Sequence, residues 1–203
     1  MYQRLPLLLI ATALLSAPAF AQKTPFEGLS LGLNAVLDSS STELGPDAQR
    51  LSGLGWTTQG ASIQGAWGWP VGESSIFSVG ATYHLSDISS GDSNTNGGAF
   101  SLKRHSAYSV YMEPGFKLSN QTLVYATVGY EAANMRLDTS TGGTEQSIEG
   151  AGYGVGMRSY FSKHGYVQVE IKQLDYRATH FPDQTANFKA SATEGLLGVG
   201  YQF

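Results

Sequence analysis

The histidines and cysteines are the first residues to consider, because their side chains bind metals and act as bases or nucleophiles. The chain has no cysteine, which excludes disulfides and thiolate metal sites. The four histidines, His84, His105, His164 and His180, show no metal-ligand spacing. His84 and Ser86 form an H-x-S pair, which could place a base near a nucleophile. We nevertheless predict no metal centre, no cofactor and no catalytic site.

Charged residues recur on the polar side of several alternating segments. Alternate residues of an extended strand share one face, so these side chains are expected to meet inside a closed sheet. The set consists of three acids and three bases: Glu113, Lys117, Glu131, Arg158, Glu170 and Lys172. Unpaired charges away from water would be costly, so we predict an interlocked ion-pair network. A conducting pathway and a proton or gating relay are the alternatives.

A glycine-rich run could suggest a nucleotide site. Gly150, Gly152, Gly154 and Gly156 form several G-x-G pairs. A dinucleotide site needs such glycines between a buried strand and the start of a helix. Here the two-residue period continues straight through the run, so we predict that these glycines face the interior of a narrow barrel.

The segments that carry these residues alternate apolar and polar side chains, which is the period of an extended strand. Eight such segments cover residues 28–37, 61–69, 77–85, 108–118, 124–132, 150–161, 167–172 and 193–203. After residue 172 the phase slips, so that Leu174 and Tyr176 stand in the opposite phase. We interpret this slip as a bulge or as the exit from the membrane.

Long polar stretches and short turns alternate between the segments. The long stretches are residues 38–58, 86–105, 136–147 and 177–192, and the short turns are 70–74, 119–121 and 162–165. Outer-membrane barrels have this topology, with both termini on the periplasmic, short-turn side. The sequence therefore predicts an all-β fold, an eight-stranded antiparallel up-and-down transmembrane β-barrel.

Aromatic residues help to distinguish a membrane barrel from a soluble one. Trp and Phe residues lie at the turn ends of the apolar face, and the loop ends carry Tyr83, Tyr108, Tyr130 and Tyr176. Such girdles mark the two boundaries of a bilayer. A soluble barrel such as a lipocalin would turn its apolar face inward. Here the glycines lie on the polar face, which suits a narrow polar interior and an apolar face in lipid.

Residues 1–21 have the features of a secretory signal peptide: Arg4, an apolar run over residues 5–15, and the small-x-small site Ala19-Phe20-Ala21. We expect cleavage after Ala21, which leaves one barrel domain over residues 22–203. The apolar run is too short for a spanning helix. Without Arg4 the 12 basic residues become 11 against 16 acidic ones, a net charge of about −5, so no nucleic-acid partner is expected.

The second long stretch ends in the basic cluster Lys103-Arg104-His105. We expect this stretch to be a solvated, exposed loop. Basic side chains at a bilayer rim meet anionic headgroups. The alternative to a purely solvated loop is a contact of Lys103 and Arg104 with lipopolysaccharide phosphates.

Three segments carry a resemblance to a known family: Y-M-E-P-G-F-K-L over residues 111–118, L-V-Y-A-T-V-G-Y over 123–130, and G-V-G-Y-Q-F over 198–203. With the signal peptide, they resemble the OmpA/OmpX-type small outer-membrane barrels, which include opacity-type and Ail-like surface proteins. The resemblance implies an integral place in a bacterial outer membrane and recognition of Tyr201 and Phe203 by the barrel-assembly machinery. The peptidoglycan-binding domain of full-length OmpA relatives is missing, so cell-wall anchoring is not expected.

These observations favour a barrel with a polar, plugged lumen that serves membrane integrity and surface interaction through its extracellular loops. Its expected partners are outer-membrane lipid, lipopolysaccharide, the barrel-assembly machinery, and host or surface ligands at the loops. The alternative is an OmpW-like conduit for small hydrophobic molecules, which needs an apolar lumen or a lateral opening. A lipid A-modifying enzyme is less favoured, because His84 is expected to point inward and not toward lipid.

Overall fold

The computed structural model describes residues 25–44, 56–95, 98–139, 142–177, 179–180 and 187–203. They form ten strands: β1 (Gly28–Leu44), β2 (Trp56–Val71), β3 (Ser75–His84), β4 (Ile88–Thr95), β5 (Gly98–Lys117), β6 (Thr122–Thr139), β7 (Gly142–Tyr160), β8 (Gly165–Tyr176), β9 (Thr179–His180) and β10 (Asn187–Gln202). The predicted signal peptide, residues 1–21, lies outside the described residues. Within the described ranges, no helix is long and apolar enough to cross a membrane.

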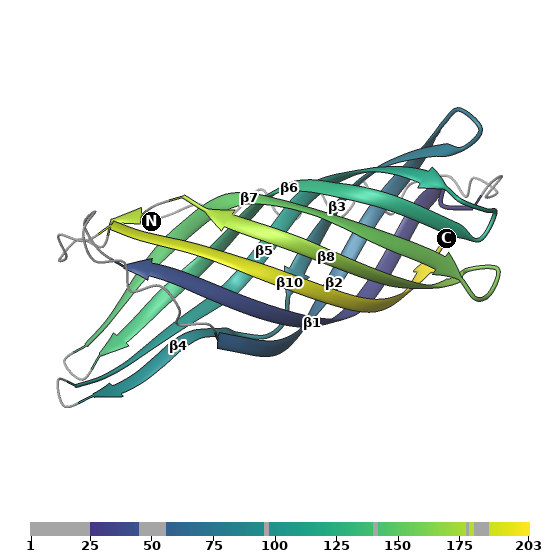
Figure 1. Cartoon of the computed structure of the whole chain (residues 1–203). Helices are drawn as coiled ribbons and strands as arrows, with labels where there is room; N and C mark the ends of the chain where they lie inside the picture. Colours follow the sequence, from purple (N-terminus) through teal and green to yellow (C-terminus); the bar gives the residue numbers. More distant parts are fainter. Residues whose placement is uncertain (1–24, 45–55, 96–97, 140–141, 178, 181–186) are drawn as a thin grey trace, which may run out of the picture.

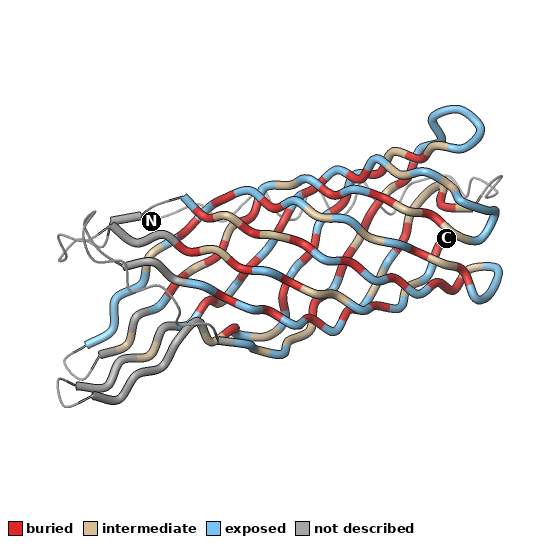
Figure 2. The backbone as a smooth tube through the Cα atoms, viewed as in Figure 1, coloured by how far each residue is buried: buried red, intermediate tan, exposed pale blue. Residues whose placement is uncertain are grey.

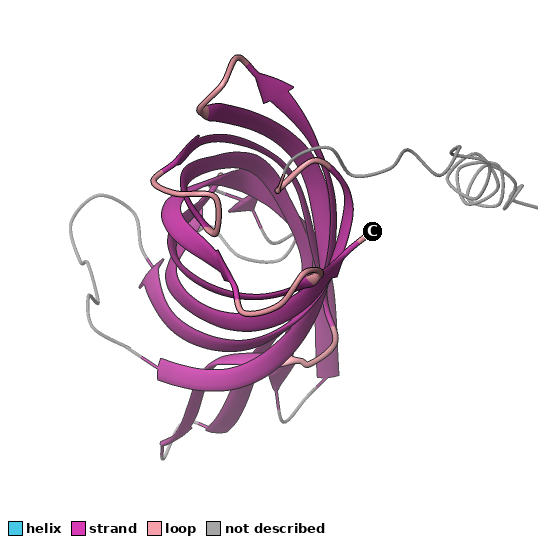
Figure 3. Ribbon diagram, turned by 90° about the vertical axis from the view of Figure 1, so that its right-hand side faces the viewer, coloured by secondary structure: helices cyan, strands magenta, loops and turns pink. Residues whose placement is uncertain are grey.

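The strands form one antiparallel sheet that closes on itself (Figures 1 and 3). The order around the wall is β1-β2-β3-β5-β6-β7-β8-β10, and β10 pairs back with β1. The short strand β4 pairs with β5 beyond the point where β3 ends. In the same way, β9 pairs with β10 beyond the point where β8 ends. The wall therefore has eight strands, and the predicted eight-stranded antiparallel barrel is confirmed.

Where the structure describes their burial, residues alternate between buried and exposed along the wall strands (Figure 2). At the closing seam, for example, Leu33 is 53% exposed, whereas its neighbour Asn34 is 2% exposed. Leu33 pairs with the outward Val199, and Ser30 pairs with the inward Gln202. The outward rows are apolar and the inward rows are polar over the membrane depth, as a barrel wall in lipid requires.

The strands extend further at their outer ends than the sequence predicts. A bilayer needs about 9–11 residues per strand, whereas β1 has 17 residues and β5 has 20. Residues 86–105, predicted as a loop, form much of a β4–β5 hairpin, and β6 pairs with β7 as far as Thr139 and Gly142. At the tip of β7 residues 142–147 are exposed or half-buried on both faces, so the two-residue period disappears there although the strand continues. The three short turns lie where they are predicted.

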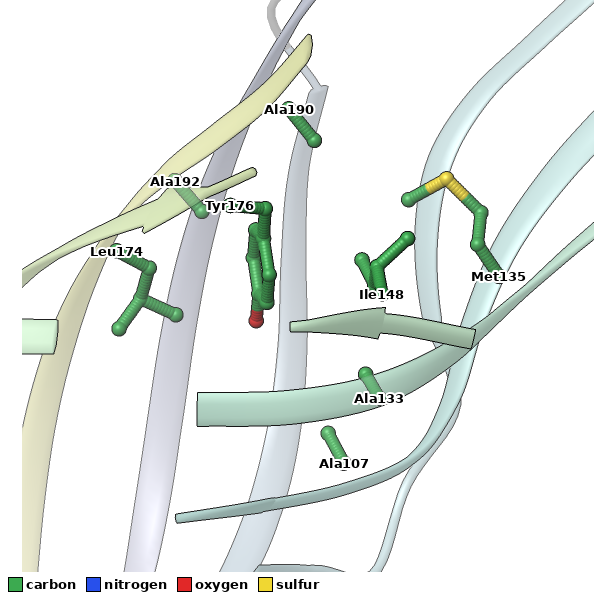
Figure 4. Packing of buried hydrophobic residues seen from close by; sticks show 8 residues of the cluster. All are labelled: Ala107, Ala133, Met135, Ile148, Leu174, Tyr176, Ala190 and Ala192. Atoms are coloured by element: carbon green, nitrogen blue, oxygen red, sulfur yellow. The ribbon is translucent and has the colours of Figure 1, made fainter. Parts of the chain in front are cut away.

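Of the two interpretations of the phase slip near residue 173, the bulge is wrong, because the pairing of β8 with both neighbours continues there without a register shift. β8 keeps its alternation up to Tyr176, and both Leu174 and Tyr176 point into the barrel. The phase seemed to slip because the interior itself becomes apolar toward the outer end. There an inward cluster (Figure 4) consists of Ala107, Ala133, Met135, Ile148, Leu174, Tyr176, Ala190 and Ala192. Tyr176 therefore does not belong to the lipid-facing girdle.

Candidate functional site in the barrel interior

Arg158 fills the interior near the short-turn end of the barrel. One nitrogen of its guanidinium, Nη2, lies 3.4 Å from Glu113 Oε2, and its Nε donates to Gln168 Oε1 at 3.2 Å. The guanidinium carbon lies 5.2 Å from the ring centroid of Tyr125 and 5.0 Å from that of Tyr166, so both rings make cation–π contacts. Arg158 thus joins side chains of four strands, β5 to β8, across the lumen.

Amide side chains fill the adjoining part of the cross-section. Asn34 Nδ2 donates to Ser62 Oγ and to Gln64 Oε1, both at 3.2 Å. Gln168 Nε2 donates to Asn34 Oδ1 at 2.9 Å and to Gln64 Oε1 at 2.7 Å. These four buried residues come from β1, β2 and β8 and hydrogen-bond one another, which meets the requirement that buried polar groups be paired.

Glu194 on β10 is the centre of a second ion-pair group, closer to the outer end. Its carboxylate lies 3.1 Å from Arg104 Nη2, 3.6 Å from Lys172 Nζ and 3.9 Å from His84 Nε2. Lys172 Nζ also lies 3.1 Å from Glu131 Oε1. All five side chains are at most 11% exposed. Arg104 and Lys172 are each shared between two acids. Each of these two cations therefore links strands on different sides of the lumen.

Arg104 is a correction to the predicted lipopolysaccharide contact. Its side chain is buried inside the barrel, where it binds Asp38 as well as Glu194 and donates to the Tyr176 hydroxyl at 3.1 Å. A guanidinium in this position cannot reach a headgroup. The cause is a bulge between His105 and Tyr108, which reverses the phase of β5 and turns Arg104 inward.

Among the six residues of the predicted charge network, the structure places five inside the barrel: Glu113, Glu131, Arg158, Glu170 and Lys172. Glu170 has no cation within ion-pair distance in the described part of the chain, and its Oε2 accepts a hydrogen bond from the Tyr125 hydroxyl at 3.1 Å. Lys117 is only half-buried and forms no ion pair with any described residue. It ends β5 beside a turn, where a long side chain reaches water.

Three described interior residues with charged side chains and one histidine are absent from the predicted network: Asp38, Arg104 and Glu194, and His84. Glu194 stands on the polar face of the last alternating segment, which was a signal for its place. Asp38 continues the inward phase of Asn34 but begins a stretch predicted as loop. With these residues, the described interior holds five carboxylates and three Lys or Arg cations.

The ion-pair groups around Arg158 and around Glu194 form two levels along the barrel axis. A small cavity separates these two levels. Its volume is about 10 Å³, and its lining includes Tyr111, Thr127 and Glu170. That volume is at the lower limit for one water molecule. Among the described residues, no group of three or more His, Asp or Glu side chains is placed to hold a metal ion.

A closed antiparallel barrel with an apolar wall, a polar interior and short turns at one end defines the class of integral outer-membrane β-barrels. The family model for the outer membrane protein beta-barrel domain matches residues 7–203, and the chain belongs to that family. The protein is therefore an integral protein of the outer membrane.

Solved structures of small surface barrels share this fold. Neisserial surface protein A (NspA) is 14% identical, with 87% of this chain and 98% of that chain covered and a TM-score of 0.55. Ail of Yersinia pestis, solved with the heparin analogue sucrose octasulfate, is 14% identical over 87% and 99%, with a TM-score of 0.51. OprG of Pseudomonas aeruginosa is 13% identical over 89% and 98%, with a TM-score of 0.52. No curated protein sequence matches the chain.

Proposed function

We propose that the protein is a closed surface barrel, which contributes to outer-membrane integrity and engages partners through its outer hairpins while passing no solute through its lumen. The observation that carries this proposal is the small cavity between the two ion-pair levels, about 10 Å³ in volume. A solute would need to displace the side chains on either side of it.

Displacing those side chains is costly because they are paired charges away from water. Lys172 is shared between Glu131 and Glu194, and Arg104 is shared between Asp38 and Glu194. Separating a buried charge from its partner costs about 3–5 kcal/mol. Because the pairs span several strands, a continuous path requires more than one such separation.

A conduit for small hydrophobic molecules is the second candidate, and the apolar cluster of Figure 4 is the feature that favours it. The cluster does not continue through the barrel, since the charged levels of Glu194 and Arg158 lie between it and the short turns. Proteoliposomes loaded with a self-quenching, permanently charged aromatic dye, which an intact bilayer retains, test this point. With a closed barrel, dye should be lost at the same rate as from dye-loaded liposomes without protein, whereas a conduit should raise the rate of dye loss.

Surface interaction is proposed to involve the outward side of β5 and β6. Lys103 is exposed and lies directly across from Arg136, whose side chain is 55% exposed. Like charges placed opposite each other destabilise a sheet, and a bound anion would relieve this repulsion. Asp138 offsets Arg136 in part, at 2.9 Å. The heparin analogue in the Ail structure supports testing a polyanion at this position.

Lipopolysaccharide and heparin are suitable probes for this surface. Wild-type protein in micelles should bind both, and Lys103→Glu should weaken the binding of both. Lys163→Glu is the matched control, because Lys163 is an exposed cation in a turn at the opposite end of the barrel. Equal binding by wild type and Lys103→Glu would remove this surface from the proposal.

We propose no enzymatic role for the protein. His84 lies 3.9 Å from Glu194 inside the barrel, with its side chain 5% exposed, so it does not face the lipid where an acyl chain would arrive. Purified protein should leave the acylation pattern of lipid A unchanged. A changed pattern that His84→Ala abolishes would establish the enzyme reading instead.

A further inference from the structure

The residues just before β1 fold back into the short-turn mouth of the barrel. Phe26 is only 2% exposed although it precedes the first strand. Its φ angle is +74° and that of Gly28 is +85°, both in the left-handed region. A phenylalanine rarely adopts this conformation, so its surroundings must hold it there.

Phe26 is held by an aromatic ring and by a chain of hydrogen bonds. Its ring packs at a tilt against Tyr160, with 4.8 Å between the centroids, and its N–H donates to the Tyr160 hydroxyl at 3.3 Å. That hydroxyl donates to Gln202 Oε1 at 3.1 Å. Gln202 Nε2 in turn donates to the carbonyls of Glu27 at 2.8 Å and Leu29 at 3.0 Å.

Gln202 stands at the periplasmic end of the seam that closes the barrel. Its Cα pairs with that of Ser30, which is the last pair of the β1–β10 ladder at this end. Its side chain is 1% exposed and points inward. The hydrogen bonds to Glu27 and Leu29 therefore continue the fastening of β10 to the start of the chain beyond the ladder.

The wall of β2 leaves room for this segment at Gly68. A Cβ atom at Gly68 would lie 2.2 Å from the carbonyl oxygen of Phe26, which no side chain could accommodate. Phe26 also belongs to a buried cluster with Ile76, Leu123 and the ring of Tyr166. The seat for Phe26 is thus built from β2, β3, β6, β7 and β8, and the Tyr160 hydroxyl that holds Phe26 gains its partner Gln202 only when β10 has closed the barrel against β1.

We propose that Phe26, Tyr160 and Gln202 form a latch, which docks after barrel closure, shuts the short-turn mouth and fastens the β1–β10 seam there. This latch is a second closure, distinct from the ion-pair levels of the proposed function. It predicts two separable effects: the mouth opens when Phe26 is removed, and the seam weakens when Gln202 is replaced.

The absence of cysteine allows a single reporter thiol to test the mouth. Ser78→Cys is suitable, because Ser78 is 3% exposed and lies beside Gly68 behind the latch. In folded protein in micelles, a small methanethiosulfonate reagent should label this thiol slowly. With Phe26→Ala, labelling should rise about 100-fold, which corresponds to about 2.8 kcal/mol at 1.4 kcal/mol per factor of ten. Phe161→Ala, at an exposed aromatic on the same end, should leave the rate unchanged.

A second reporter separates the latch from the charged levels. Ala192→Cys lies in the interior on the outer side of Glu194. Phe26→Ala should expose the Ser78→Cys thiol but not the Ala192→Cys thiol. Fast labelling of Ser78→Cys in the parent would contradict the latch, because this thiol lies behind Phe26 on the short-turn side of the charged levels. Equal, slow labelling of Ser78→Cys with and without Phe26→Ala would overturn the latch alone.

The seam is tested by unfolding rates of the heat-modifiable form in detergent. Gln202→Leu should unfold about tenfold faster than wild type, or about 1.4 kcal/mol, whereas Gln121→Leu, an exposed turn glutamine, should not. The effects of Gln202→Leu and Phe26→Ala on the unfolding rate should be non-additive, because both break one latch. Additive effects would show two independent contacts.

Deleting residues 25–27 should still allow the barrel to fold, because the latch is proposed to dock after closure. Failure to fold would contradict docking after closure.

Discussion

Replacing Arg158 with methionine tests how much the Arg158–Glu113 ion pair, near the short-turn end, contributes to the free energy of unfolding. In Arg158→Met the carboxylate of Glu113, which is 2% exposed and whose Oε1 has no hydrogen-bond partner among the described residues, loses its cation. An orphaned buried charge costs about 3–5 kcal/mol, and the loss of the two cation–π contacts adds about 1 kcal/mol. Adding Glu113→Gln removes the orphaned charge, so the double variant should lose only about 1–2 kcal/mol.

Urea unfolding from lipid vesicles, followed by the loss of the fast-migrating folded band on unboiled gels, measures these differences. Lys117→Met is the control, since Lys117 is half-buried and has no ion pair among the described residues; it should change stability by less than about 0.5 kcal/mol. A double variant as unstable as Arg158→Met would refute the reasoning, because the loss would then come from packing and not from an uncompensated charge.

Three further predictions use other parts of the barrel. Gly200→Ala should cost about 1–3 kcal/mol, because its Cβ would lie 2.1 Å from the buried ring of Tyr166, whereas Gly195→Ala, with open space around it, should be nearly neutral in the same urea assay. Deleting Phe203 should lower the heat-modifiable population in outer membranes, and unchanged assembly would argue against its role as a signal. The defect of Lys103→Glu in heparin binding should shrink as salt rises, since exposed charges are screened beyond about 8 Å at 0.15 M; a salt-independent defect would point to misfolding.

The fold could be predicted because the wall strands of a membrane barrel have a characteristic pattern of apolar and polar residues. Lipid outside and polar groups inside force a strict two-residue period, and Leu33 beside Asn34 shows how sharply the two faces differ. The positions of the three short turns followed from breaks in that period. The outer extensions could not be found in this way, because their interior is apolar at Met135 and Ile148 and their tip at residues 142–147 of β7 has no buried face, so the contrast of polar inside and apolar outside is lost.

The interior was predictable only where the phase was unbroken. Glu113, Arg158 and Glu170 lie in segments with continuous alternation, and the structure places all three inside. Arg104 was misplaced because one extra residue near Ser106, whose φ angle is +53°, reverses the phase of β5. Phe26 lies before any alternating segment, and its seat depends on side chains brought together from five strands, which local sequence cannot show.

The central claim is that the lumen is closed, and planar-bilayer recording of the refolded barrel tests it most directly. The filled interior and the cavity of about 10 Å³ predict a current equal to that of the bare bilayer, with no reproducible conductance steps. Steady channels of one conductance, repeated across independent preparations, would contradict the claim and show that the ion-pair levels admit a pathway.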